Sequence, residues 1–246
     1  MPAVRDVAVL SVATFPARHG FSTTELGSMG LTQAPDAAAV MERRRQLAEA
    51  VGFDLNRAAF AEQVHGAAVH AFRRAEGVPG GQTVRRTDVL TSDVPGQALL
   101  TFHADCYPLL VVDPARGAVG SAHAGWRGTL DRAGEALVLA MREAYGSRPE
   151  ELEVLVGPGI CGECYEVGPE VVAAFRERLP EADRSLRPRG GRAALDLACA
   201  LKLQLERAGV APDHVTDLAA CTREDARWFS HRGGRSGRFL AAIVVP

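Results

Sequence analysis

Two apolar runs that flank one tight turn constrain the fold of this sequence more than any other feature. Residues 108 to 112 (PLLVV) and 118 to 123 (AVGSAH) are separated by DPARG, in which proline follows aspartate and glycine closes the turn. That composition predicts a turn, and the runs on either side predict the two strands of an antiparallel β-hairpin. If the strands pair about the middle of the turn, residue numbers across the ladder sum to about 231, which places His123 opposite Pro108.

Cys106 lies two residues before Pro108 and should therefore share a face of the hairpin with His123. Because side chains alternate along a strand, the two residues would be diagonal neighbours with Cβ atoms roughly 7 to 8 Å apart. This spacing suits two ligands of one metal ion, or a thiol and an imidazole brought together by a bent chain. A register shift of one residue would instead place them on opposite faces, and a free cysteine is often simply a buried core residue.

The rest of the chain predicts a mixed α+β architecture. Strand-like runs bounded by Gly, Pro or Asp recur at 6–15, 59–64, 67–73, 97–103, 108–112, 118–123, 152–156 and 238–245. Helical patterns, three of them closed by glycine, cover 36–52, 129–146, 169–179 and 194–209. The charged segment 178–194, rich in Pro and Gly, is predicted to be a mobile loop. Strands come in consecutive groups as well as alternating with helices, which favours one α+β domain over residues 1–246, with mixed sheets flanked by helices.

Composition excludes several classes of protein. The 28 basic and 30 acidic residues leave a net charge of −2, which gives no electrostatic reason to expect nucleic acid or an anionic membrane as a partner. No apolar stretch approaches the ~20 residues of a membrane-spanning helix, and the short apolar run after Asp6 predicts a strand rather than a signal peptide. Five cysteines, an odd number, indicate reduced thiols and a cytoplasmic protein. Neither a dinucleotide-binding glycine pattern nor a Walker lysine is present.

Several short motifs, read together and in order, resemble one known family. They are EQVHG (62–66), ADCYP (104–108), HAGWRG (123–128), GPGICGECYEVG (157–168), CT at 221 and WFSHR (228–232). This set resembles the polyphenol oxidase or laccase-domain proteins, whose bacterial members are also called purine nucleoside phosphorylase or peptidoglycan editing factor. The resemblance runs from ARHGFS near residue 17 to SGRFLAAIV at the end, and it implies the cysteine-hydrolase-like fold of that family.

The resemblance also implies a metal site. The family's ligands correspond to His65, Cys106 and His123, which would be the catalytic residues as well. Two histidines and a thiolate form a reasonable zinc set, with copper less favoured, and three protein ligands leave a fourth position open, as in catalytic zinc sites.

The activity implied by the resemblance is zinc-dependent phosphorolysis of purine nucleosides. Adenosine, inosine, guanosine and methylthioadenosine are the expected substrates, with phosphate as the second, and adenosine deamination is a possible additional reaction. Arg127, directly after the HAGW motif, is our first choice for a phosphate contact, because guanidinium matches phosphate geometry and a helix follows. Arg18 is the second choice.

Other candidate residues have weaker signals. His103 and Asp105 flank Cys106 and could orient it. Cys161 and Cys164 have the spacing of redox pairs and zinc knuckles, but no second pair of this kind exists, so packing or incidental reactivity is favoured. His19 and His231 attract interest only because they lie in family-like motifs.

Three other functions remain as alternatives. Cys106 and His123 could act as nucleophile and base of an amidase that edits peptidoglycan precursors. A copper polyphenol oxidase is disfavoured, because multicopper sites need many histidines, whereas this chain has seven and no His-x-His pair. A non-enzymatic module with a structural zinc is disfavoured as well, because such sites close the fourth position with a further Cys or His.

Overall fold

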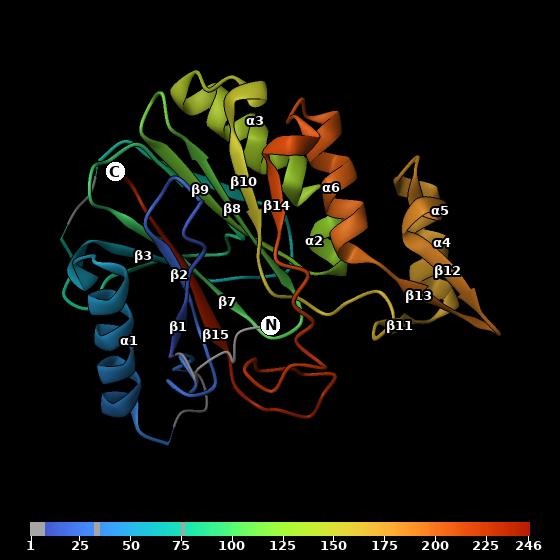
Figure 1. The fold of residues 1–246 in the computed structure, drawn as a ribbon, viewed down its shortest axis with the longest axis horizontal. Coiled ribbons are helices and arrows are strands. Elements are labelled where there is room, and N and C mark those ends of the chain that lie inside the picture. Colours follow the sequence, from blue (N-terminus) through green and yellow to red (C-terminus); the bar gives the residue numbers. More distant parts are fainter. Residues whose placement is uncertain (1–7, 32–34, 75–76) are drawn as a thin grey trace.

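The computed structural model describes residues 8–31, 35–74 and 77–246, and two six-stranded sheets packed face to face form its centre (Figure 1). Sheet A has the order β1 (Val9–Leu10), β2 (His19–Ser22), β15 (Phe239–Val244), β7 (Ala98–His103), β3 (Ala58–Ala61) and β5 (Gln82–Val84). Sheet B has the order β14 (Val215–Asp217), β10 (Glu153–Val156), β8 (Tyr107–Asp113), β9 (Ala118–Ala124), β6 (Val89–Ser92) and β4 (Val69–Phe72).

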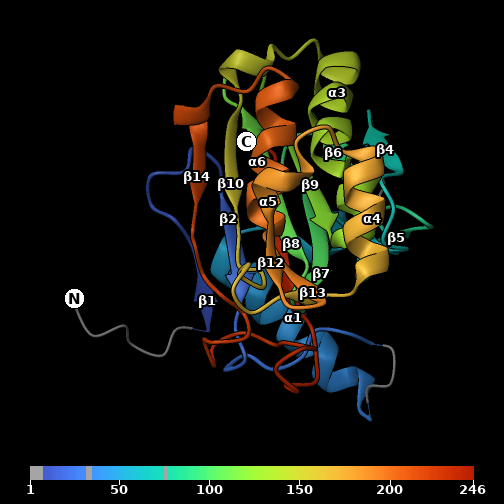
Figure 2. The ribbon, with the colours of Figure 1, turned by 90° about the vertical axis from the view of Figure 1, so that its right-hand side faces the viewer.

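Strand β8 is apolar without interruption because both of its faces are buried. Leu110 and Val112 pack in the core between the two sheets, whereas Leu109 and Val111 face the helices α3 (Ala133–Tyr145) and α6 (Leu197–Arg207). A strand covered on both faces has no solvent side for polar residues, so the usual apolar–polar alternation is lost. Figures 1 and 2 show α3 and α6 on the outer face of sheet B.

The outer face of sheet A is covered by α1 (Ala37–Val51). Leu47 and Val51 of this helix belong to the same buried cluster as Leu100 of β7. The side chain of Asp36 caps the helix by accepting a hydrogen bond from the backbone of Ala39 at 3.0 Å. The order of layers is therefore helix, sheet A, sheet B, helices, and the predicted α+β fold with mixed sheets is confirmed.

A small lobe lies to one side of the two main sheets (Figure 1). It contains a three-stranded sheet, β11 (Glu166–Val167), β13 (Arg192–Leu195) and β12 (Leu186–Arg189), with α4 (Pro169–Arg178) and α5 (Ala182–Ser185). The predicted mobile loop at 178–194 is thus wrong. Ala193, Ala194 and Leu195 of β13 are buried while the arginines of β12 are exposed, so the segment is a hairpin with one strand turned to the core and one to solvent.

The predicted register of the central hairpin is confirmed, since Pro108 of β8 pairs with His123 of β9. The predicted helix at 129–146 differs in the structure. It is divided into α2 (Trp126–Leu130) and α3, because Arg132 between them has a φ of 61°. The predicted strand at 6–15 contributes only β1, with residues 6 and 7 outside the described part. Among the described residues, no helix is both long enough and apolar enough to span a bilayer.

Candidate metal centre where the chain crosses between the sheets

Two connections pass from sheet A to sheet B at the same end of the structure. Residues 62–68 lead from β3 to β4, and residues 104–106 lead from β7 to β8. His65 lies on the first connection and Cys106 on the second, while His123 lies one residue before the end of β9. The topology therefore brings three segments that are distant in sequence to one point.

These three side chains meet closely. One ring nitrogen of each histidine and Sγ of Cys106 all lie within 4.8 Å of one another, and the two imidazole centroids are 4.9 Å apart. The structure thus brings together the residues that the family resemblance singled out. His65 is exposed, Cys106 half-buried and His123 buried. A Cβ on Gly125 would lie 2.7 Å from Cys106 Sγ, so only glycine leaves room for the sulfur there.

A single buried carboxylate organises two of the three residues. Oδ1 of Asp88 accepts hydrogen bonds from Nδ1 of His123 at 2.9 Å and from the backbone of His65 at 3.0 Å. Its Oδ2 accepts from the backbones of Val64 at 3.1 Å and Gly66 at 2.9 Å. Burial would raise the pKa of Asp88, but the hydrogen bonds from His123 and the backbone outweigh burial and lower it. Asp88 was missed from the sequence, where its only signal is an aspartate placed directly before an apolar strand.

The Cys106 thiol and the His123 imidazole shift each other's ionisation. Burial raises the pKa of Cys106, but the charge of His123 and hydrogen bonds with His123 and His65 outweigh it and bring the value to about 6. Burial lowers the pKa of His123, but the Cys106 thiolate and Asp88 bring it to about 9. The metal-free protein at neutral pH therefore holds a thiolate beside an imidazolium.

The donor set fits a metal ion. A thiolate and two imidazoles are common zinc ligands, and the thiolate is already favoured at neutral pH. With Nδ1 of His123 engaged by Asp88, its Nε2 is the ring nitrogen left for coordination. A carboxylate behind a ligating histidine is the usual way in which proteins fix the ring and its tautomer.

His103 and Asp105 both hold the backbone around Cys106. Nδ1 of His103 lies 3.1 Å from the Cys106 carbonyl oxygen, and its Nε2 lies 2.8 Å from Oγ1 of Thr101. Burial lowers the pKa of His103 well below the usual value, so the ring is neutral. Its place beneath the cysteine agrees with an orienting role.

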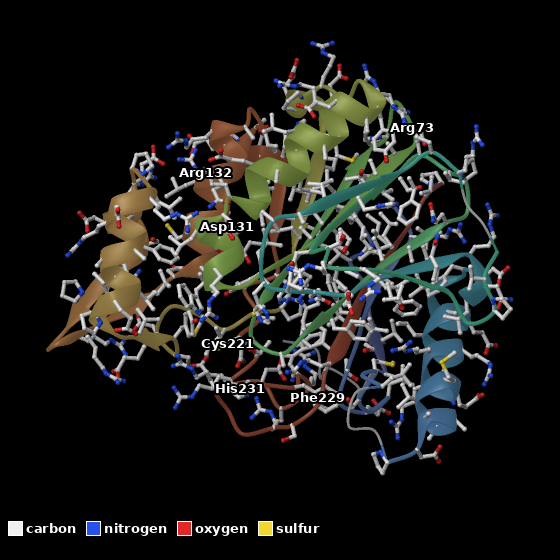
Figure 3. All side chains as sticks on the ribbon, turned by 180° about the vertical axis from the view of Figure 1, so that it is seen from behind. Arg73, Asp131, Arg132, Cys221, Phe229 and His231 are labelled. Atoms are coloured by element: carbon white, nitrogen blue, oxygen red, sulfur yellow. The ribbon has the colours of Figure 1, made fainter. Side chains whose placement is uncertain are left out.

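Asp105 holds the C-terminal loop, residues 218–238, beside the candidate metal centre through hydrogen bonds. Its carboxylate accepts hydrogen bonds from the hydroxyls of Thr222 at 2.7 Å and Ser230 at 2.6 Å, and from the backbone of Arg232 at 2.7 Å. Asp105 has a φ of 88°, a strained conformation that these three bonds hold in place. Figure 3 labels Cys221, Phe229 and His231 along this loop.

Two cavities open beside Cys106, and both also border His65 and Arg238. The Tyr165 cavity has a volume of about 250 Å³ and is lined further by Trp126, Ile160, Tyr165, Leu197, His231 and Arg232. The Arg44 cavity has a volume of about 630 Å³ and is lined further by Ser28, Arg44, Phe60, Glu62, Gln63 and Phe102. The candidate metal centre therefore lies where two separate hollows meet.

Three arginines bring positive charge to these cavities. Arg44 is buried, stacks 4.5 Å from the Phe60 ring centroid and donates to the Met29 carbonyl, and burial lowers its pKa to about 10. Arg232 donates to the Glu166 carbonyl at 2.8 Å, and Arg238 to that of Gly237 at 2.7 Å. Within the described part of the chain, none of the three arginines forms an ion pair with a carboxylate, and their charge is available to an anionic ligand.

Neither of the two predicted phosphate-binding arginines lines either cavity. Arg127 is exposed and stacks 4.3 Å from the Trp126 ring centroid at the rim of the Tyr165 cavity, but it is not among the lining residues. Its helix, α2, is only five residues long, too short for the expected helix-terminus contribution. Arg18 donates to the Gly52 carbonyl at the end of α1 and lines neither cavity.

The two histidines that lie in family-like motifs, His19 and His231, have different surroundings. His19 is buried in β2, where Nε2 accepts from the backbone of Val12 at 2.9 Å and Nδ1 bonds the Ala17 carbonyl at 2.8 Å. Both ring nitrogens are therefore engaged with the backbone. His231 is exposed and lines the Tyr165 cavity.

Comparison with known proteins gives consistent matches. Residues 12–246 match the model of the family described as multi-copper polyphenol oxidoreductase laccase. The chain is 42% identical over 217 residues to a purine nucleoside phosphorylase of Deinococcus radiodurans, covering 87% of this chain and 80% of the relative. It is 34% identical over 217 residues to adenosine deaminase RL5 of an unknown prokaryotic organism, covering 85% and 82%. The crystal structure of YlmD from Geobacillus stearothermophilus superposes with a TM-score of 0.87 at 34% identity, covering 97% and 98%.

Proposed function

This chain belongs to the multi-copper polyphenol oxidoreductase laccase family, and on that premise we propose that it is a zinc-dependent purine nucleoside phosphorylase. The observation that carries the proposal is the meeting of two cavities beside His65 and Cys106, with arginines that form no ion pair with a carboxylate of the described part. A phosphorylase must hold a nucleoside and a phosphate on either side of one reacting carbon, and this arrangement provides two such places.

We assign the nucleoside to the Arg44 cavity. Its volume of about 630 Å³ lies in the usual range for small-molecule sites, and the half-buried ring of Phe102 offers an apolar face for a purine. Adenosine, inosine, guanosine and methylthioadenosine are the proposed substrates, since all share a purine on a ribose.

We assign the phosphate to the smaller Tyr165 cavity. Arg232 and Arg238 would neutralise its charge, and the exposed ring of His231 would add a hydrogen-bond donor. The reaction breaks the bond between ribose C1′ and the purine nitrogen and forms a bond between C1′ and a phosphate oxygen. The products are the free purine base and ribose 1-phosphate.

His65, Cys106 and His123 would hold the zinc ion. When bound, zinc supplies Lewis acidity that polarises and orients an oxygen nucleophile. The protein's own contribution is to fix the three donors. Asp88 holds His123 and the loop of His65, while His103 and Asp105 hold the backbone around Cys106. Copper oxidase chemistry is not supported, because the two groups in the described residues that could hold a metal ion contain only two histidines between them.

Adenosine deamination is a related activity of the same centre. It would deliver water instead of phosphate to purine C6, and one relative carries the name adenosine deaminase RL5. The same zinc ligands would serve both reactions.

A second candidate function is an amidase. Cys106, His123 and Asp88 form a chain of thiolate, imidazolium and carboxylate, which is the arrangement of a cysteine hydrolase. This activity would use Cys106 as nucleophile on an amide of a peptidoglycan precursor, and zinc on the same sulfur would inhibit it. The two functions therefore respond to zinc in opposite ways.

The deciding experiment is a product assay with purified, zinc-loaded protein. A nucleoside panel is incubated with and without phosphate, and products are identified by mass, with Cys106→Ala as control. Phosphate-dependent release of free base and ribose 1-phosphate, absent in the variant, supports phosphorolysis. If no nucleoside is turned over and the metal-free protein cleaves a peptidoglycan precursor, the amidase replaces phosphorolysis as the proposed function.

A further inference from the structure

A second cluster of potential metal ligands lies outside the centre described above. Sγ of Cys161, Cys164 and Cys221 and a carboxylate oxygen of Glu224 all lie within 4.8 Å of one another. The sequence favoured mere packing for Cys161 and Cys164 because no second cysteine pair follows them. The structure adds two potential donors, Cys221 and Glu224, which come from the C-terminal loop 60 residues further along the chain.

The backbone holds these two segments side by side. Gly159 forms a parallel bridge with Cys221, in which Gly159 donates to the Ala220 carbonyl at 3.1 Å and Thr222 donates to the Gly159 carbonyl at 2.9 Å. The bridge pairs Cys221 with Gly159, two residues before Cys161, and the backbone N–H of Cys161 lies 3.4 Å from Sγ of Cys221. The arrangement is thus part of the fold and does not depend on flexible surface side chains.

Hydrogen bonding within the cluster is typical of a metal thiolate site. The backbone N–H of Cys161 points to Sγ of Cys221 at 3.4 Å, and a backbone donor of this kind stabilises the anionic form of a sulfur. Cys164 donates its backbone N–H to the Cys161 carbonyl at 3.0 Å, so the two-residue spacing forms a tight turn that presents both sulfurs on one side. Sγ of Cys164 lies 3.3 Å from Oε1 of Glu224.

We propose that Cys161, Cys164, Cys221 and Glu224 bind a structural zinc ion. Three thiolates select zinc over the hard cations, and a carboxylate oxygen is an accepted fourth ligand. Zinc–sulfur bonds of about 2.3 Å in a tetrahedron separate the sulfurs by about 3.8 Å, so the cluster needs to contract only slightly. Four protein donors close the coordination sphere, which distinguishes this site from the three-donor centre at Cys106.

Other uses of these thiols fit the structure less well. A redox pair consists of two cysteines, and a third thiol and a carboxylate at the same point have no role in it. The five cysteines of the chain are all free thiols.

The proposed zinc would stabilise the loops that support the catalytic centre. Thr222, next to Cys221, donates its hydroxyl to the Asp105 carboxylate at 2.7 Å, and Ile160, next to Cys161, donates its backbone N–H to the Asp105 carbonyl at 2.9 Å. Asp105 in turn precedes Cys106. The structural ion would therefore tie both loops to the residue that positions the catalytic thiol, whatever reaction takes place there.

The test is the zinc content of the full chain. Protein is purified with zinc, dialysed and measured by mass spectrometry of the metal. We expect two zinc ions per chain in the wild type, one in the Cys161→Ser/Cys221→Ser variant, one in Cys106→Ser and two in the matched control Cys199→Ser, whose half-buried thiol belongs to neither cluster. A wild type that holds one ion and a Cys106→Ser variant that holds none would overturn the proposal.

Three further measurements cover the case in which the double variant does not fold. Cys106→Ser retains the second cluster intact, so cobalt bound to it should give the intense thiolate charge-transfer absorption of three sulfurs. Glu224→Gln should keep the fold and weaken binding at this site alone. Cobalt in Cys106→Ser without thiolate absorption, or an intact mass that is two hydrogens lighter through a disulfide within the cluster, would refute the structural zinc.

Discussion

The Asp88 carboxylate lies 2.9 Å from Nδ1 of His123, and both side chains are almost completely buried. The same carboxylate also holds the backbone of His65, so one anion fixes two of the three donors that meet at Cys106. A histidine held in this way presents Nε2 in a single orientation and tautomer. Several properties of the centre should therefore depend on Asp88.

Replacing Asp88 by asparagine should weaken zinc binding at this centre by about 10- to 100-fold, the usual cost of removing a carboxylate behind a ligating histidine. The amide cannot accept from all four donors, and it removes the charge that supports His123. Zinc affinity is measured by competition with a chromophoric chelator. Asp93→Asn, which alters only a surface ion pair with Arg73, is the control. Equal affinities of both variants and the wild type would show that Asp88 does not organise the ligands.

The metal-free protein should show an unusually acidic thiol at Cys106. Because the thiolate is the form that reacts, alkylation by iodoacetamide should reach half its maximal rate near pH 6, and the rate should fall below that pH as the sulfur becomes protonated. Cys199 serves as an internal comparison, because burial raises its pKa and its alkylation should need a higher pH. Peptide mapping separates the two sites. A half-maximal pH above 8 for Cys106 would mean that His123 does not hold a thiolate there.

Removing zinc should separate the two proposed activities. Chelation should abolish phosphorolysis, and added zinc should restore it, because the ion supplies the Lewis acidity of the proposed reaction. The amidase candidate predicts the reverse, since the free Cys106 thiolate is its nucleophile. Nucleoside turnover is followed by release of free base before chelation, after chelation and after readdition of zinc. Unchanged nucleoside turnover in a preparation shown to be metal-free would contradict the zinc-dependent mechanism.

Arg232→Gln should raise the KM for phosphate by at least about tenfold, because hydrogen bonds to a charged group are among the stronger polar interactions. The KM for inosine should stay within about twofold, since the nucleoside is assigned to the other cavity. Arg176→Gln is the matched control, because Arg176 is exposed and pairs with Asp183 in the lobe. A larger increase in the KM for inosine than in the KM for phosphate would reverse the assignment of the cavities.

The central hairpin could be predicted from the sequence because its information is local. A turn of known type fixes the register, and the register brings Cys106 and His123 to one end of the strands. His65 was placed only by family resemblance. Nothing in its own neighbourhood indicates that the connection from β3 to β4 passes beside β9.

Long-range partners could not be read from the sequence. Asp88 acts through residues more than 20 positions away. Cys221 meets Cys161 because their segments follow the paired strands β14 and β10 and are joined by one further bridge. The short strand β2 (HGFS) was missed for a related reason, because it has little apolar pattern and gains its place by pairing with β15. In each case the decisive contact joins segments that are distant in the sequence.

Gly125 offers a steric test of the centre itself. A Cβ at this position would lie 2.7 Å from Cys106 Sγ and 3.4 Å from Cδ2 of His65, so Gly125→Ala must displace the sulfur or the ring. We expect a loss of zinc at this centre and at least a hundredfold loss of turnover, with the protein still folded, because the added methyl group points toward the site and not into the core. Gly191→Ala, where a Cβ meets nothing within 4 Å, should leave both properties unchanged. Zinc content, circular dichroism and turnover are measured on both variants. Full zinc content and normal turnover in Gly125→Ala would mean that Cys106 does not hold the ion in the position described.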